Sequence, residues 1–442
     1  MLKLKTWKET LDFMYQRLPM YQRIGAAAYK KDLTNTILLC EACGNPHRLL
    51  KCVHIAGTNG KGTTTHIIAS GLQSQGYNIG VYTSPHYVDF RERIKINGLY
   101  ISKKYIISFI NTYIDEIETI QPSFFELTVA LAFRYFADQK VDFAVIETGL
   151  GGRLDSTNVI TPLISVITNI SYDHQSMLGH TLPLIAAEKA GIIKQNIPVV
   201  IGESQEDVQE VFIKKSKEVH APLIFADQHL SLVQKSDSGS ELVYDVYLDN
   251  KLWLNNLRSS LIGPFQSKNI ITGLYALKEL SKMIPSDFNK VIEVFPEIHQ
   301  QTGYMGRWQI LDKNPLVVVD SAHNTGGISI VVDELKKFKE GRLHIIMGFV
   351  NDKDISEILN MMPQNAAYYF AKANIPRGLD AVDLKNQAKN AGLKGNSYIS
   401  VRKAFAAARQ KAKKGDTIFI GGSIFVVGEV LKTYIEKQKI NS

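Results

Sequence analysis

The sequence predicts an α/β protein with two domains, each built on a mostly parallel sheet. Short β-rich runs alternate with helical runs along most of the chain, which is typical of βα units. The 442 residues are enough for two or three domains at roughly 150 residues per domain. The alternation lapses around residues 298–303 and then starts again. We therefore expect a P-loop-type domain over residues 1–297, a linker over about 298–303 and a smaller, Rossmann-like domain over 304–442.

Apolar runs of strand length place the expected sheets. In the first domain they are residues 53–57, 79–83, 143–147, 164–169 and 198–202. Helical periodicity follows Lys61, covers 124–137 and lies around 183–193. An alternating stretch at 242–248 predicts an antiparallel excursion, and a helix is expected over 267–283. In the second domain the strand-like runs are residues 316–320, 343–348, 367–371 and 417–420.

The composition is that of an ordinary globular protein, with 45% hydrophobic and 21% charged residues. The excess of Lys and Arg over Asp and Glu, 51 against 43, favours anionic partners. Nucleic acid is not expected among them, because no basic stripe is interleaved with aromatic residues. No apolar run reaches the roughly 18 to 20 residues of a membrane-spanning helix, and the N-terminal segment has no signal-peptide core. We expect a cytoplasmic protein with no membrane partner.

Cys40, Cys43, His47 and Cys52 have a spacing that is similar to a small zinc knuckle. However, the first two cysteines close an apolar stretch, and Cys52 opens the first expected strand, which a knuckle loop could not also be. Three small buried thiols are therefore the favoured interpretation.

A glycine-rich segment directly follows the first expected strand and precedes a helix. It consists of Gly57, Thr58, Asn59, Gly60, Lys61, Gly62 and Thr63. Its glycines allow backbone amides to converge on phosphate oxygens, Lys61 supplies a point charge, and the helix N-terminus adds partial positive charge. The segment departs from the form G-x-x-x-x-G-K-[ST], because Ile55 occupies the first glycine position and Gly62 separates lysine from hydroxyl. It predicts a phosphate loop, with simple tight packing as the alternative.

Three polar residues lie at, or just after, the ends of later expected strands, where open α/β sheets bind ligands. They are Ser84, Glu147 and His174. Their hydroxyl, carboxylate and imidazole could share one Mg²⁺ with phosphate oxygens and water, although Mg²⁺ prefers oxygen to nitrogen. The alternatives are a solvated loop acid for Glu147 and a hydrogen-bonded turn residue for His174.

The motifs also form an ordered series that spans nearly the whole chain. The series comprises residues 57–63, 82–86, 147–158, 173–175, 188–194, 306–309 and 320–324. It resembles the folylpolyglutamate synthases of the Mur ligase superfamily. The resemblance implies an ATP-dependent amide ligase that joins L-glutamate to dihydropteroate or to folates through an acyl phosphate, releasing ADP and phosphate.

The resemblance also implies roles for single residues. Lys61 would act on the transferring phosphoryl group, Lys189 would be carbamylated, and His323 would act near ATP or glutamate. The magnesium ligands would be Ser84, Glu147 and His174, and the further nucleotide contacts would be Asn269, Arg307 and Asp320. The pteroate side would comprise Ser123, Phe124, Phe125, Glu126, Leu154, Asp155 and Ser156, with an earlier loop at residues 21–25. ATP would bind between the two domains.

Two other functions are compatible with a phosphate loop. A cell-wall ligase of the same superfamily needs a further domain ahead of the loop, but only 56 residues precede Gly57. A non-enzymatic nucleotide-binding module would use the same loop and the positive charge. We expect a monomeric enzyme whose partners are small molecules, and the segments at 123–126 and 154–156 favour activity on both dihydropteroate and folates.

Overall fold

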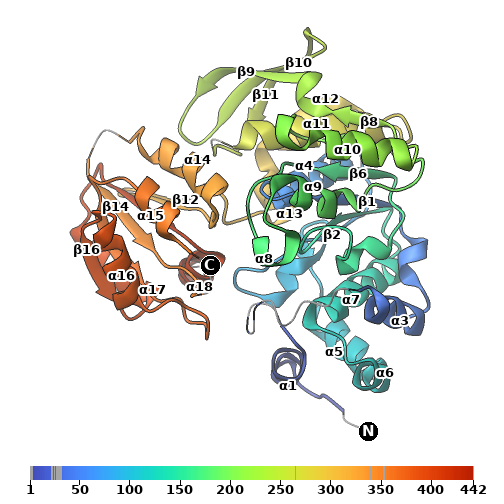
Figure 1. Cartoon of the computed structure of the whole chain (residues 1–442), viewed down its shortest axis with the longest axis horizontal. Coiled ribbons are helices and arrows are strands. Elements are labelled where there is room, and N and C mark those ends of the chain that lie inside the picture. The colour runs from blue at the N-terminus through green and yellow to red at the C-terminus, as the bar shows by residue number, and fades with distance from the viewer. Residues whose placement is uncertain are drawn as a thin grey trace. The chain divides into compact units, whose positions relative to one another are not determined.

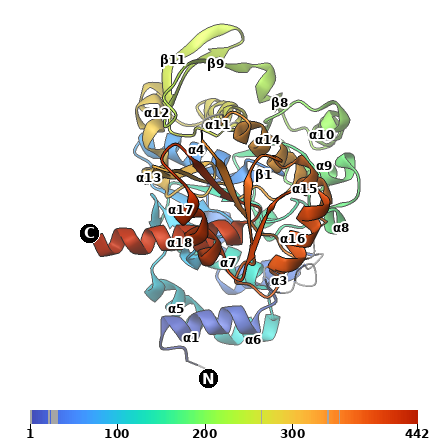
Figure 2. The ribbon, with the colours of Figure 1, turned by 90° about the vertical axis from the view of Figure 1, so that its left-hand side faces the viewer.

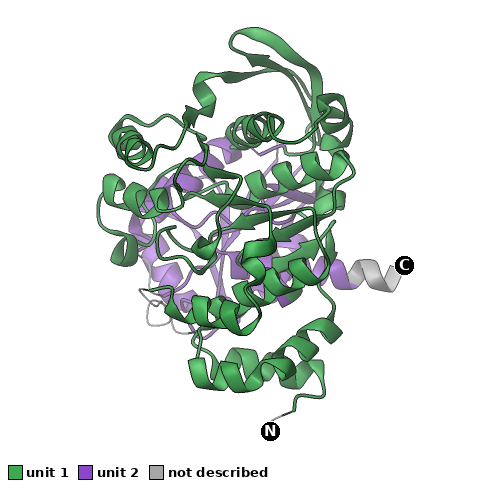
Figure 3. Cartoon of the chain, turned by 90° about the vertical axis from the view of Figure 1, so that its right-hand side faces the viewer, with its two compact units in different colours: residues 1–86, 91–261, 265–304 green, residues 87–90, 262–264, 305–442 purple. Residues whose placement is uncertain are grey.

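The computed structural model describes residues 3–20, 23, 25, 32–263, 265–338, 341–351 and 354–441, the side chains up to residue 436. The chain divides into two compact units (Figure 3). The first unit comprises Met1–His86, Arg91–Leu261 and Phe265–Tyr304. The second comprises Tyr87–Phe90, Ile262–Pro264 and Met305–Ser442.

The first unit is built on an eight-stranded sheet with the order β4-β3-β2-β5-β1-β6-β7-β8 (Figure 1). Its strands are β1 Cys52–Ala56, β2 Ile79–Tyr82, β3 Ile94–Ile96, β4 Leu99–Tyr100, β5 Phe143–Glu147, β6 Ile164–Ile167, β7 Val199–Ile201 and β8 Leu223–Phe225. All are parallel except β3 and β4, which form an antiparallel edge. The inner strands β1, β2, β5 and β6 are buried along their whole length, as expected of a parallel sheet covered on both faces.

Helices surround this sheet. They are α1 Trp7–Asp12, α3 Thr34–Ala42, α4 Lys61–Ser74, α5 Lys103–Thr112, α6 Ile114–Ile120, α7 Phe124–Asp138, α8 Gln175–Leu178, α9 Leu182–Ala190, α10 Glu206–Glu218, α11 Gln266–Leu280, α12 Phe288–Val294 and α13 Ile298–Thr302. Helix α4 is buried over most of its length and packs against α11. In the described part of the chain, no helix is long and apolar enough to cross a membrane.

A separate antiparallel sheet, ordered β11-β10-β9, lies next to α11 and α12 (Figure 2). Its strands are β9 Leu230–Asp237, β10 Leu242–Leu248 and β11 Lys251–Ser259. The predicted antiparallel excursion is therefore confirmed, because β10 occupies residues 242–248 and pairs antiparallel with both neighbours.

The second unit holds a six-stranded sheet with the order β12-β13-β17-β14-β15-β16. Its strands are β12 Gln309–Lys313, β13 Leu316–Val319, β14 Leu343–Met347, β15 Ala367–Ala371, β16 Gly395–Tyr398 and β17 Thr417–Gly421. Only β12 runs antiparallel, so the predicted α/β class holds for this unit as well. Its helices are α14 Thr325–Leu335, α15 Ser356–Met361, α16 Ala381–Asn390, α17 Val401–Lys411 and α18 Ile424–Asn441.

The strands that the apolar runs predict are all present, within one or two residues at their ends. Seven further strands are not among the predicted runs: β3, β4, β8, β9, β11, β12 and β16. All seven lie at or next to a sheet edge, where a strand needs less apolar sequence than in the middle of a covered sheet. The segment proposed as a linker, residues 298–303, contains α13 and clusters with the first unit.

Candidate active site

The predicted phosphate loop connects β1 to α4 at the carboxyl end of the sheet. Gly57 and Gly60 have φ angles of 146° and 82°, which disfavour any residue with a side chain. A Cβ atom at Gly57 would overlap Thr168 Oγ1, and one at Gly60 would overlap Asn269 Oδ1. The loop therefore needs these glycines both for its conformation and because neighbouring side chains lie directly against its backbone.

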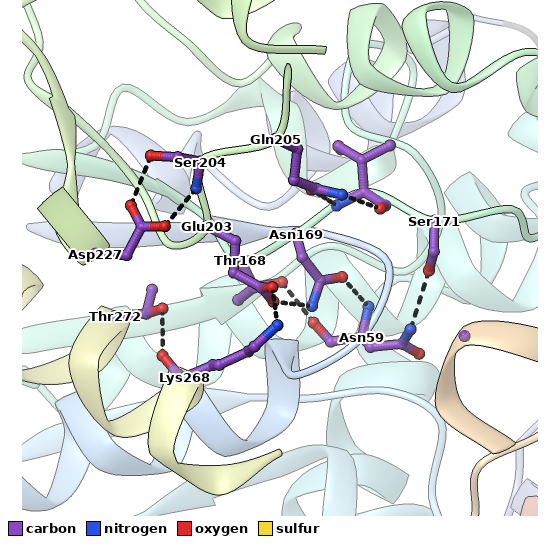
Figure 4. A network of polar contacts seen from close by, with 12 residues as sticks. Asn59, Thr168, Asn169, Ser171, Glu203, Ser204, Gln205, Asp227, Lys268 and Thr272 are labelled. Carbon is purple, nitrogen blue, oxygen red and sulfur yellow. Dashed lines mark hydrogen bonds and ion pairs between the residues drawn. The ribbon is translucent and has the colours of Figure 1, made fainter. Parts of the chain in front are cut away.

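Side chains that follow β6 hold the loop from one side (Figure 4). Thr168 Oγ1 donates to Asn59 O at 2.6 Å. The backbone nitrogen of Asn59 donates to Asn169 Oδ1 at 3.0 Å, and its side-chain amide donates to Ser171 Oγ at 3.0 Å. These contacts fix the backbone of the loop without using its glycine amides.

A second layer orients Asn169 itself (Figure 4). Its Nδ2 donates to Glu203 Oε1 at 2.9 Å, and Glu203 Oε2 accepts from Lys268 Nζ at 2.5 Å. Because the carboxylate only accepts, it fixes the amide with Nδ2 toward Glu203 and Oδ1 toward the phosphate loop. Sequence reasoning missed Glu203 and Lys268, since neither lies in a motif.

Two lysines converge on one carbonyl of the loop. Lys61 Nζ donates to Gly57 O at 3.0 Å and to Thr58 O at 3.1 Å, and Lys189 Nζ donates to Gly57 O at 2.8 Å. Lys189 is only 3% exposed, and its burial together with the charge of Lys61 lowers its pKa from 10.5 to about 7. Two lysine side chains beside a helix N-terminus form an arrangement that suits an anionic ligand.

Glu147 and Ser84 meet beside the start of α4. The backbone nitrogen of Ser84 donates to Glu147 Oε2 at 3.2 Å, and a Cβ atom at Gly62 would lie 3.7 Å from that same oxygen. His174 lies in the loop after β6, where its Nε2 is 3.7 Å from Asp173 Oδ1. Among the described residues, no three His, Cys, Asp or Glu side chains are grouped to hold a metal by themselves. Glu147 and Ser84 nevertheless fit Mg²⁺. The buried carboxylate of Glu147 and the hydroxyl of Ser84 are oxygen ligands, and they leave coordination positions for phosphate and water.

Asp155 holds the glycine turn that follows β5. Its Oδ2 accepts from the backbone nitrogens of Gly149 and Leu150, both at 2.8 Å, and its Oδ1 accepts from Thr157 N at 3.0 Å. Thr157 Oγ1 also donates to Oδ1 at 2.5 Å and lies 2.8 Å from Nε2 of the buried His54. Burial raises the pKa of Asp155, and these hydrogen bonds oppose that rise. Of the neighbouring predicted residues, Leu154 is half-buried and Ser156 is buried.

The predicted pteroate segment forms the start of α7. Ser123 and Glu126 make a reciprocal capping box, with Ser123 N donating to Glu126 Oε2 at 2.6 Å and Glu126 N to Ser123 Oγ at 3.2 Å. Phe124 is buried beneath the guanidinium of Arg93, 5.4 Å from the ring centroid. Phe125 lies directly against Gly149 of the glycine turn. Of the loop at residues 21–25, Tyr21, Gln22 and Ile24 lie outside the described residues.

The remaining predicted nucleotide residues are divided between the units. Asn269 lies on α11 of the first unit, against Gly60. In the second unit, Asp320 follows β13 and accepts from Trp308 N at 2.8 Å and Ala322 N at 2.7 Å. Burial raises the pKa of Asp320, whereas the neighbouring Arg307 lowers it. His323 Nδ1 lies 3.0 Å from Ser321 O in the same segment.

The cysteines behave as small apolar residues. Cys40, Cys43 and Cys52 are all free and buried, and burial raises the pKa of each thiol to about 12. Their burial agrees with the interpretation of three small buried thiols.

Two segments match family models. Residues 55–277 match the Mur ligase middle domain, and residues 306–424 match the Mur ligase glutamate ligase domain. With the phosphate loop and the paired lysines in place, the chain is an ATP-dependent ligase of the Mur type.

Similar proteins identify the family within this class of ligases. The chain is 33% identical over 404 residues to the dihydrofolate synthase/folylpolyglutamate synthase of Bacillus subtilis, covering 88% of this chain and 91% of the relative. It is 31% identical to the folylpolyglutamate synthase of Lacticaseibacillus casei, covering 91% and 94%. The chain belongs to the folylpolyglutamate synthase family.

Solved structures agree with this assignment. Escherichia coli FolC in complex with DHPP and ADP is 26% identical, with a TM-score of 0.86, and the match covers 99% of this chain and 100% of that chain. The Mycobacterium tuberculosis folylpolyglutamate synthase complexed with ADP is 27% identical, also with a TM-score of 0.86, over 97% and 98% of the two chains.

Proposed function

We propose that this enzyme attaches L-glutamate to dihydropteroate and to folate (poly)glutamates, using ATP and releasing ADP and phosphate. The observation that carries the proposal is the convergence of Lys61 and Lys189 on Gly57 O, beside a buried Glu147 and the N-terminus of α4. Relatives named for both synthase activities, and a relative solved with DHPP and ADP, support the substrates.

A carboxylate is a poor electrophile, so the γ-phosphoryl group of ATP is first transferred to it. The carboxylate oxygen forms the new bond to phosphorus, ADP leaves, and the product is an acyl phosphate. Lys61 and the backbone amides at the start of α4 stabilise the negative charge that spreads over the transferring group. The amine of glutamate then attacks the activated carbonyl carbon, loses a proton and expels phosphate.

Mg²⁺ would be held by Ser84, Glu147 and His174. When bound, it would neutralise phosphate charge and orient the transferring group. Glu147 is suited to this because its carboxylate already lies beside Gly62 of the phosphate loop.

Lys189 is proposed to be carbamylated. Only an uncharged amine attacks CO₂, and the lowered pKa of about 7 leaves a large fraction of Lys189 uncharged near neutral pH. The new N–C bond and the loss of a proton would replace a cation by an anion. The repulsion between Lys61 and Lys189 would then become an attraction, and the carbamate could share the metal.

The remaining site residues receive supporting roles. Asn269, Arg307 and Asp320 would contact the nucleotide, and His323 would act near ATP or glutamate. On the pteroate side, Phe125 would present its ring to the heterocycle, because it lies on the glycine turn that Asp155 holds. Ser123 and Glu126 would act by fixing the start of α7.

The decisive assay supplies ATP, Mg²⁺ and glutamate with either dihydropteroate or a reduced monoglutamyl folate. We expect glutamate incorporation into both. Incorporation only into the folate would remove the synthase half of the proposal, and incorporation into neither would overturn it. A nucleotide-linked muramyl precursor in the same assay tests the cell-wall alternative, which would be favoured if only that acceptor reacted.

We place the enzyme in the cytoplasm as a monomer. Its three cysteines are free, which suits a reducing compartment. Light scattering of the purified chain with and without ATP would test the monomer.

A further inference from the structure

A tyrosine outside the predicted motifs contacts the phosphate loop helix. Tyr304 is the last residue of the first unit, and its hydroxyl lies 2.7 Å from Thr63 Oγ1. Gln266 Nε2, on α11, donates to the same tyrosine oxygen at 3.2 Å. All three side chains are buried. The contact joins residues that are 241 positions apart, so no local pattern reveals it.

The hydrogen bonds around this hydroxyl have a definite direction. Asn269 Nδ2 donates to Gln266 Oε1 at 3.0 Å, which turns Gln266 Nε2 toward Tyr304. A phenol oxygen that already accepts from an amide is best satisfied by donating its own proton. The geometry allows either oxygen to donate in the contact between Tyr304 and Thr63, and donation by Tyr304 leaves the Thr63 proton for another acceptor.

This series of hydrogen bonds begins and ends beside the phosphate loop. Asn269 lies against Gly60 at one end, and Thr63 stands in the first turn of α4 at the other. We infer that Tyr304 is a positioning residue that orients the hydroxyl of Thr63 toward a phosphate group of bound nucleotide. The inference rests on the proposed function, because it takes nucleotide phosphate to bind at this loop.

The ring of Tyr304 is held independently of its hydroxyl. His66 and His299 lie against it, with ring centroids at 5.2 and 5.1 Å. The backbone is also tied down, since Tyr304 O lies 3.1 Å from His299 Nδ1. A phenylalanine at this position would keep these contacts, so Tyr304→Phe removes the hydroxyl alone.

The test is a double-mutant cycle of Tyr304→Phe and Thr63→Val, with MgATP affinity measured by calorimetry and kcat and KM measured in parallel. We expect Tyr304→Phe to weaken MgATP binding about 10-fold, the value of one buried hydrogen bond. Thr63→Val should cost at least as much, and the double variant should be no weaker than Thr63→Val alone. Tyr304→Phe should lower the melting temperature only slightly, because it leaves the buried amide of Gln266 without its acceptor but keeps the ring contacts.

The matched control is Tyr77→Phe, which removes a hydroxyl that contacts Pro285 O at 3.4 Å at the surface. It should leave MgATP affinity unchanged. Unchanged affinity in Tyr304→Phe, or additive losses in the double variant, would overturn the inference. Because the cycle reads nucleotide binding, a parent that binds MgATP but ligates no glutamate would contradict the proposed function alone.

Discussion

Two polar clusters, one in each unit, differ in how they arrange charged side chains. At the carboxyl end of the first sheet, Lys61 and Lys189 share one carbonyl, and the pKa of Lys189 falls to about 7. In the second unit, at the amino ends of β14 and β17, His344 Nδ1 lies 2.9 Å from the Tyr369 hydroxyl and its Nε2 lies 3.4 Å from Asp416 Oδ2. Lys61 is half-buried and the other side chains of the two clusters are buried, but only the first cluster places like charges together.

The second cluster is satisfied by the protein itself. Asp416 accepts from the backbone nitrogens of Arg342 and Lys413 at 2.7 and 2.8 Å. Burial raises the pKa of Asp416, but these hydrogen bonds and His344 outweigh it, so the pKa lies below 3.8. The two clusters therefore differ in charge: the second pairs a carboxylate with a histidine, whereas the first brings two lysines to one carbonyl, an arrangement that suits an anionic ligand.

The largest effect is expected from Lys61→Ala. The lysine is proposed to act on phosphoryl charge rather than in the core, so ligation should fall at least about 1000-fold while the melting temperature is retained. Steady-state assays and thermal unfolding measure the two. Lys217→Ala, an exposed lysine on α10, is the control and should keep full activity. Substantial ligation by Lys61→Ala would contradict the distinction between the two clusters, since the lysine cluster would then not be catalytic.

Lys189→Met should reduce ligation by roughly 100-fold and change the pH dependence of stability. The folded-state pKa of Lys189 is about 7 and its ordinary value is 10.5, so the unfolded chain binds more protons between these values. The parent therefore gains stability from this group as pH rises from 7 to 10.5. The variant should be more stable than the parent at pH 6, and the gap should narrow by pH 10.

Urea denaturation across this pH range measures the difference in the free energy of unfolding between the parent and Lys189→Met. A constant difference between the two proteins would show that Lys189 titrates normally in the folded state and would contradict the account. Bicarbonate should raise the activity of the parent and leave that of Lys189→Met unchanged.

Asp416→Asn should affect stability only. Its amide nitrogen would face backbone donors, which costs about 1 to 3 kcal/mol at pH 7, with kcat unchanged. Because the pKa of Asp416 is below its ordinary value of 3.8, its contribution is present above that pH and lost as pH falls. The cost should therefore shrink at pH 3. Asp333→Asn, whose side chain is exposed, is the control. A loss of activity in Asp416→Asn would contradict the assignment of the second cluster to a structural role.

The smallest effect is expected from Glu203→Gln. The substitution replaces the carboxylate by a neutral amide. The hydrogen bond from Asn169 and the ion pair with the exposed Lys268 are both weakened, so KM for ATP should rise only about 3-fold. Glu206→Gln, exposed at the start of α10, should leave KM unchanged. If KM in Glu203→Gln stays at the parent value, the orientation of Asn169 does not depend on this carboxylate.

The sequence predicts most of the fold, because the inner strands are short apolar runs and the phosphate loop has a local glycine pattern. It misses β3, whose central residue is Lys95, because a charged residue argues against a buried strand. In the structure Lys95 is buried and donates to Gly303 O at 3.1 Å. Such a partner cannot be inferred from spacing.

In the candidate site, too, some residues have a local sequence pattern and others depend on contacts between distant segments. Glu147 ends a strand that the pattern identifies and Lys61 lies in the glycine-rich segment after another, whereas Glu203 and Tyr304 make contacts with segments far away in the sequence. Phe124 and Phe125 are equivalent in the sequence, and only packing separates the buried ring from the ring on the glycine turn.

The most direct test of the central claim follows an oxygen atom. Dihydropteroate labelled with ¹⁸O in its carboxyl group is incubated with the enzyme, MgATP and glutamate, and the released phosphate is analysed by mass spectrometry. If the phosphate loop directs γ-phosphoryl transfer to the carboxylate, an ¹⁸O atom from the acid appears in the phosphate. Release of unlabelled phosphate during glutamate addition would contradict the account.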